Sequence, residues 1–112
     1  MALNNGQMSI SYKPRQITIG GQKYKITYQK NLEDFGTLDV DKKIITVREN
    51  LSTQERLDTI LHEAYHASLA LSGLSYLLDD ENKEEALVRA FDSILLPVIK
   101  KELRKIQKTK GN

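Results

Sequence analysis

The sequence contains no cysteine and no tryptophan, and only two prolines and two histidines. Without cysteine the chain can form neither disulfides nor thiolate metal sites, so any transition metal must be bound by His, Asp or Glu. No apolar run approaches the length of a membrane span, and residues 1–15 lack the apolar stretch of a signal peptide. A net charge of +2 gives no strong attraction to nucleic acid or to membranes. A reducing cytoplasm suits such a chain.

Length and composition favour one globular domain. The 112 residues are long enough to bury a core without disulfides, and the 39% hydrophobic and 29% charged shares are ordinary for such a domain. We expect the domain to span residues 16–106, after a flexible polar leader over residues 1–15. Residues 107–112 are expected to form a basic, flexible tail.

The first half of the chain has the alternating pattern of strands. Gly20-Gly21 separates two alternating segments and can supply the positive φ angles of a tight hairpin. A second pair of short strands is expected on either side of a charged turn. The expected strands lie within residues 17–19, 24–28, 37–40 and 44–47, which gives a small antiparallel or mixed sheet of three to four strands.

The second half has helical periodicity. Ser52 followed by Glu55 forms a capping-box pattern, and Gly73 is a plausible C-terminal cap, so a helix is expected between them. A second long helix is expected from about Asn82 to about Ile106, with a kink or break at Pro97. The class is therefore α+β. The expected core faces are Leu57, Ile60, Leu61, Ala64, Ser68 and Leu71 on the first helix, and Leu87, Val88, Phe91, Ile94, Leu95 and Val98 on the second.

Both histidines lie in the segment TILHEAYHASLALSG, within an H-E-x-x-H motif. Because a helix has 3.6 residues per turn, His62 and His66 lie on one face and can bind one metal ion together. Glu63 is rotated away from that face, where it can act as a general base on a metal-activated water. The competing interpretation is two solvated histidines on an ordinary helix.

A catalytic zinc site needs a third protein ligand, and the chain has no third histidine to supply it. The ligand must therefore be a carboxylate, and the start of the second helix offers Glu81, Glu84 and Glu85. Periodicity favours Glu84 slightly, whereas Glu85 lies at the edge of the apolar face and remains an alternative. Glu81 is interpreted as a solvated residue favoured by the helix dipole.

The segments TILHEAYHASLALSGL and EALVRAFDSILLPVI resemble small zinc metallopeptidase-like proteins of phages and mobile elements, similar to the ImmA/IrrE family of H-E-x-x-H metallo-endopeptidases. The resemblance spans about residues 17–99 and implies a minimal, gluzincin-type zincin-like fold. It implies Zn²⁺ bound by His62, His66 and Glu85, with Glu63 as the catalytic base. Glu84 remains a near alternative, and Asp92 is a candidate partner for a ligand histidine. The chain lacks the further histidine and the helix-turn-helix domain that such proteins often carry.

The sequence suggests three candidate functions. The first is a zinc-dependent metallopeptidase in the cytoplasm of a bacterial host, acting on a protein or peptide substrate such as a regulator from the same element. Its substrate would add to the edge strand at Thr37–Val40, and Tyr65, Tyr76 or Arg89 could stabilise the oxyanion. The alternative is an inactive zincin-fold module that uses zinc to shape a protein-binding surface. Nucleic-acid binding by the tail at Lys100–Lys110 is disfavoured because no aromatic residues are interleaved for base stacking.

Overall fold

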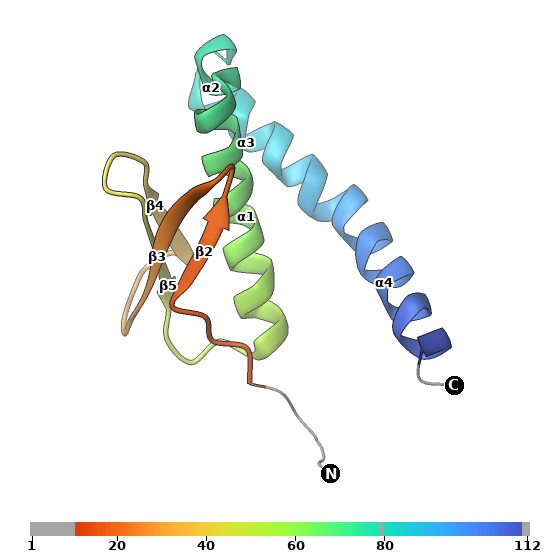
Figure 1. The fold of residues 1–112 in the computed structure, drawn as a ribbon. Helices are drawn as coiled ribbons and strands as arrows, with labels where there is room; N and C mark the ends of the chain where they lie inside the picture. The colour runs from red at the N-terminus through yellow and green to blue at the C-terminus, as the bar shows by residue number, and fades with distance from the viewer. Residues whose placement is uncertain (1–10, 79, 111–112) are drawn as a thin grey trace.

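A four-stranded sheet covers one side of a long central helix, and a second helical segment starts beside that helix and diverges from it toward the C-terminus (Figure 1). The computed structural model describes residues 11–78 and 80–110. Its strands are β2 (Gln16–Ile19), β3 (Gln22–Gln29), β4 (Gly36–Asp39) and β5 (Ile44–Arg48). The expected α+β class, with a small mixed sheet and a long C-terminal helix, is confirmed.

The strands lie in the order β2-β3-β5-β4, so β2 and β4 form the two edges of the sheet. The pairs β2–β3 and β4–β5 are antiparallel, whereas β3 and β5 are parallel. Gly20 and Gly21 form the two-residue turn between β2 and β3 with φ angles of 56° and 77°. Positive φ at both positions matches the twist of a tight hairpin and is the reason for glycine there.

The edge strand β4 lies directly against the central helix α1 (Thr53–Ser72). A Cβ atom added at Gly36 would stand only 2.5 Å from Cγ2 of Thr59. The absence of a side chain at this position therefore allows the strand and the helix to approach closely. As a result, the start of β4 lies beside the middle of α1.

The ends of α1 follow from local chemistry. The Ser52 hydroxyl accepts a hydrogen bond from the Glu55 amide at 3.1 Å, and the Glu55 carboxylate accepts one from the Ser52 amide at 2.9 Å. This reciprocal pair provides hydrogen-bond acceptors for two amides that have none within the first helical turn. Gly73 ends the helix with φ 79°. The predicted helix between these caps is confirmed, and a short helix α2 (Leu74–Leu77) follows it.

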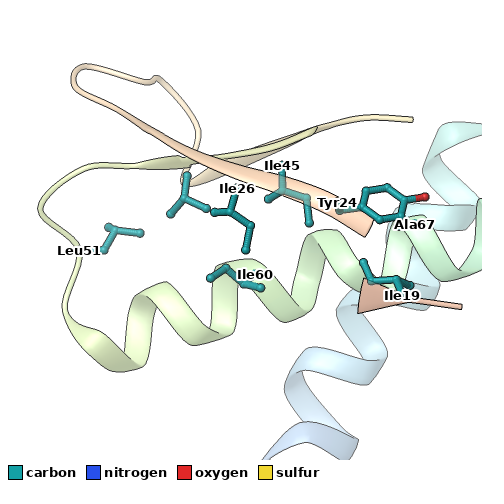
Figure 2. Packing of buried hydrophobic residues seen from close by; sticks show 8 residues of the cluster. Ile19, Tyr24, Ile26, Ile45, Leu51, Ile60 and Ala67 are labelled. Carbon is teal, nitrogen blue, oxygen red and sulfur yellow. The ribbon is translucent and has the colours of Figure 1, made fainter. Parts of the chain in front are cut away.

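The core lies between the sheet and α1. Figure 2 shows Ile26 and Ile45 of the sheet facing Ile60 of α1. The core face expected for α1 was wrong at several positions, because Ser68 and Leu71 are exposed. The buried residues of the helix are Arg56, Thr59, Ile60, Glu63, Ala67 and Leu69. Three of them are polar. A prediction from apolar residues alone therefore misses this part of the buried face.

The C-terminal helical arm, residues 81–110, comprises α3 (Glu81–Ala90), a π-turn η1 (Phe91–Leu95) and α4 (Leu96–Lys110). Pro97 was expected to kink or break this helix, and the interruption falls one turn earlier, as η1. Pro97 has no amide to donate to the preceding turn. In η1 the Leu96 amide instead donates to the Phe91 carbonyl five residues earlier.

The core face expected for the arm was largely wrong. Leu87, Ile94, Leu95 and Val98 are exposed, and among arm residues 81–107 only Val88 and Leu96 are buried. Asp92 contacts His62 of α1, and Lys100 contacts Asp58. Together with the buried Val88 and Leu96 they recur every fourth position along the arm.

Parts of the expected leader and of the expected tail lie in the described structure. Of the expected leader, residues 1–10 lie outside the described part, but the Tyr12 carbonyl accepts a hydrogen bond from Arg56 and the Pro14 carbonyl accepts one from Tyr28. Residues 107–110 of the expected tail continue α4, and residues 111–112 lie outside the described part. Among the described residues, no helix is long and apolar enough to cross a membrane.

Candidate metal centre

His62 and His66 extend from the side of α1 that faces the helical arm. Their ring centroids are 5.0 Å apart, and the ring planes cross at 64°. The spacing of four residues places them on consecutive turns of the helix. Each ring directs Nε2 toward the same carboxylate, that of Glu85 on α3.

Glu85 bridges the two histidines. Its Oε1 lies 3.2 Å from Nε2 of His62, and its Oε2 lies 3.2 Å from Nε2 of His66. One ligand atom from each of these three residues lies within 4.8 Å of the others. Ligands bound tetrahedrally at about 2.0–2.2 Å stand roughly 3.3–3.6 Å apart, close to the separations seen here. His62, His66 and Glu85 could therefore hold a metal ion.

The position of Glu85 depends on where α3 begins. The Asp80 side chain caps this helix by accepting a hydrogen bond from the Lys83 amide at 2.8 Å. The cap places Glu84 and Glu85 in the first two turns, facing α1. Glu81, interpreted from the sequence as a solvated helix-start residue, is exposed in the structure.

The second nitrogen of each histidine is also held by a carboxylate. Nδ1 of His62 lies 2.5 Å from Oδ2 of Asp92, and Nδ1 of His66 lies 2.6 Å from Oε2 of Glu84. When Nδ1–H donates to a carboxylate, the lone pair of Nε2 is free to bind a metal. Of the two glutamates left open by periodicity, Glu85 faces both Nε2 atoms and Glu84 orients His66.

The environment of Glu84 favours its charged form. Burial acts to raise the pKa of its carboxyl, but hydrogen bonds from His66 and Ser75 outweigh burial and lower that pKa below its ordinary value. A charged Glu84 is a strong acceptor for the proton on His66 Nδ1.

Glu63 lies between the histidine face of α1 and the core, and only 8% of the residue is exposed. Burial raises the pKa of its carboxyl, and Glu85 and Asp34 add to the increase, while His62 and His66 oppose it. Among the described residues, none donates a hydrogen bond to this carboxylate. A buried carboxyl with a raised pKa beside candidate metal ligands is suited to accept and return a proton.

A cleft of about 630 Å³ opens over these groups, between α1, the arm and the segment before β4. Its floor contains His62, His66, Glu63 and Glu85. Periodicity gave no signal for the wall formed by Asp34, Phe35 and Gly36, because these residues lie at or just before the start of β4, which is distant in sequence from the motif. The remaining lining residues are Glu55, Asp58, Thr59, Arg89 and Asp92.

The three side chains considered as oxyanion stabilisers lie in different places. Arg89 lines the cleft, with its Nε 3.8 Å from Oε1 of Glu85. Tyr65 packs edge-on against Phe91, with ring centroids 4.6 Å apart. Tyr76 is 90% exposed on α2 and does not line the cleft. Of the three, only Arg89 presents its side chain to the metal centre.

Comparisons of the chain with protein-family models, with curated proteins and with solved structures gave no match.

Proposed function

We propose that this protein is a zinc-dependent metallopeptidase of the H-E-x-x-H type. The observation that carries the proposal is the arrangement around Glu85, toward which both histidine Nε2 atoms point while carboxylates hold both Nδ1 atoms. Two imidazoles and a carboxylate, with no thiolate in the chain, form a donor set used by catalytic zinc. When bound, zinc supplies Lewis-acid chemistry and lowers the pKa of water to about 7.

The chain's own residues then divide the work. His62, His66 and Glu85 hold the metal, and Asp92 and Glu84 keep the histidine rings oriented. The Glu63 carboxylate accepts a proton from the attacking water and returns it to the leaving amine nitrogen, which completes cleavage of the peptide bond. The Arg89 guanidinium places positive charge on the cleft wall, where the carbonyl oxygen of the substrate becomes negative.

Strand β4 supplies a binding site for the substrate backbone. It is an edge of the sheet, and its first residue, Gly36, lies beside the cleft. An extended peptide can hydrogen-bond to an exposed edge strand, which aligns its backbone with the groups on α1. The resemblance to the ImmA/IrrE family further suggests a zincin-like fold, a bacterial cytoplasmic setting and a protein substrate such as a regulator from the same mobile element.

Metal removal tests the proposal. The purified protein is expected to contain about one equivalent of zinc and to cleave a generic fluorogenic casein substrate. A chelator should abolish cleavage, and added zinc should restore it. The variant His62→Ala should lose both zinc and activity, whereas Glu81→Gln, a change at an exposed glutamate near the same helix start, should keep both. Failure of the wild-type protein to bind zinc would contradict the proposal.

A zinc-stabilised binding module is the second candidate, and the attachment of the arm favours it. Polar groups of the arm, those of Glu84, Glu85, Asp92 and Lys100, contact α1, beside the ring contact of Phe91 with Tyr65. Among the arm residues whose side chains are described, Val88 and Leu96 are buried. A metal that ties α3 to α1 would therefore stabilise the fold. If zinc raises the unfolding temperature but no peptide is turned over, this second function is the correct one.

The carboxylates behind the histidines are expected to strengthen zinc binding. Replacing Asp92 with Asn or Glu84 with Gln removes the negative charge that polarises each ring, so zinc affinity should fall about 10- to 100-fold. Competition with a chromophoric chelator measures this affinity. Unchanged affinity in both variants would show that these carboxylates do not support the ligands.

A further inference from the structure

The cleft over the metal centre has a large excess of negative charge. Six carboxylates line it, against a single guanidinium, that of Arg89. A bound divalent cation would compensate only part of this charge. A peptide that enters such a cleft is attracted or repelled according to the charge of its own side chains.

Most of these carboxylates already have a partner. Asp92 and Glu85 contact the histidines, Glu55 caps α1, and Asp58 forms an ion pair with Lys100. Glu63 lines the floor of the cleft, and no described residue donates a hydrogen bond to its carboxylate. Its oxygens are not among the fully buried, unpartnered atoms, so a molecule in the cleft can contact them.

Asp34 is the carboxylate that remains available on the outer wall. It is exposed, lines the cleft, and forms no ion pair with any described residue. It lines the same cleft as Glu63, Glu85 and the two histidines. A peptide that occupies the cleft can therefore contact Asp34 and these groups together.

The neighbouring aromatic ring suits a cationic side chain. Phe35 is 46% exposed and lines both this cleft and a second cavity. The Arg48 guanidinium lies 4.5 Å from the ring centroid, and Arg48 lines the second cavity only. One part of the ring thus already contacts a cation, while another part faces the cleft, where it can cover the aliphatic stem of a lysine or arginine.

The edge strand brings the substrate to this point. A peptide aligned along β4 passes Gly36, which has no side chain to obstruct its neighbours. A substrate side chain that extends past the start of β4 would enter the part of the cleft lined by Phe35 and Asp34. An aromatic ring beside a carboxylate suits the apolar stem and the charged end of lysine or arginine.

We propose that the cleft selects extended peptides that carry lysine or arginine close to the cleaved bond, with Asp34 as the residue that determines this specificity. The proposal rests on the proposed peptidase function. It predicts that acidic peptides are rejected, because the same carboxylates that attract a cation repel a carboxylate.

An equimolar library of random peptides, digested by the zinc-loaded protein and sequenced, tests the proposal. Lysine and arginine should be enriched about tenfold over glutamate at one position relative to the cut. Asp34→Asn should reduce the enrichment to about twofold or less, and Asp34→Lys should reverse it. The control Asp41→Asn, in the exposed turn beyond the far end of β4, should behave as wild type. Cleavage without a basic preference, or a preference that survives Asp34→Asn, would overturn the proposal and leave the peptidase function intact.

If the library is not cut, the proposed peptidase function is wrong. A binding assay then tests whether the cleft is selective for cationic peptides. Labelled peptides of identical length, one carrying two lysines and one carrying two glutamates in an alanine background, are titrated with the zinc-loaded protein and followed by fluorescence anisotropy. Tighter binding of the lysine peptide that is lost in Asp34→Asn supports a cation-selective cleft. Equal binding of the two peptides, or no binding of either, rejects it.

Discussion

Replacing Glu63 with glutamine is expected to lower the rate of peptide hydrolysis by about 10²- to 10⁴-fold while the protein keeps its zinc. Glutamine has nearly the same shape as glutamate but cannot accept a proton from water. His62, His66 and Glu85 remain in place, so the metal centre loses only its base. Steady-state kcat/KM on a fluorogenic peptide, together with the zinc content by atomic absorption, measures the two effects separately.

The same variant has a second expected effect, on stability. Glu63 is buried, and burial raises the pKa of its carboxyl, which means that the charged form is disfavoured in the folded protein. A neutral amide avoids that desolvation cost, so Glu63→Gln should unfold at the same temperature as wild type or higher. Loss of activity together with loss of stability would indicate a structural glutamate. Retained activity would rule out the role of general base.

Replacing Gly36 with alanine is expected to destabilise the fold by about 1–3 kcal/mol and to disturb the cleft. The new Cβ atom would stand 2.5 Å from Cγ2 of Thr59, well inside van der Waals contact. Thr59 cannot turn away freely, because its hydroxyl donates a hydrogen bond to the Glu55 carbonyl at 2.7 Å. The start of β4 must therefore move away from α1. Urea denaturation measures the loss of stability, and peptide turnover measures the change in the cleft.

A matched second substitution isolates the cause. Thr59→Ser removes the obstructing methyl group but keeps the hydroxyl that bonds to Glu55. The double variant Gly36→Ala/Thr59→Ser should recover most of the lost stability, with a coupling energy of about 1–2 kcal/mol in a double-mutant cycle. Additive effects of the two changes would show that β4 and α1 do not meet at this point.

Local sequence signals predicted the elements well. The capping box at Ser52 and Glu55, the terminal Gly73 and the Gly20-Gly21 turn each depend on chemistry within a few residues, and each is found in the structure. The parallel pairing of β3 with β5 joins strands of two different hairpins, so no local sequence pattern predicts it.

Buried faces were harder to predict than helix ends. On α1 the polar residues Arg56, Thr59 and Glu63 occupy part of the buried face, and a count of apolar residues passes over them. On the arm, η1 shifts the later residues relative to a regular helix. Both errors arise where the chain positions its candidate site, since that is where polar groups replace core residues and a π-turn alters the helix.

The site itself could be predicted in part. Spacing identified His62 and His66 as a pair and left Glu84 and Glu85 open as the third group. The resemblance implied Glu85, with Glu84 as a near alternative. In the structure Glu85 faces the two Nε2 atoms, while Glu84 contacts His66 Nδ1. The contributions of Asp34 and Phe35 depend on the position of β4 at the edge of the sheet, which spacing around the motif does not describe.

The capping box has a consequence for how this cleft can change during evolution. Glu55 lines the cleft and also caps α1, so a substitution there that alters the charge of the cleft also weakens the start of the helix that carries the histidines. Asp34 lines the same cleft but has no such structural duty. Under the proposed peptidase function, variation in substrate preference is expected at position 34, while position 55 is restricted to residues that preserve the cap.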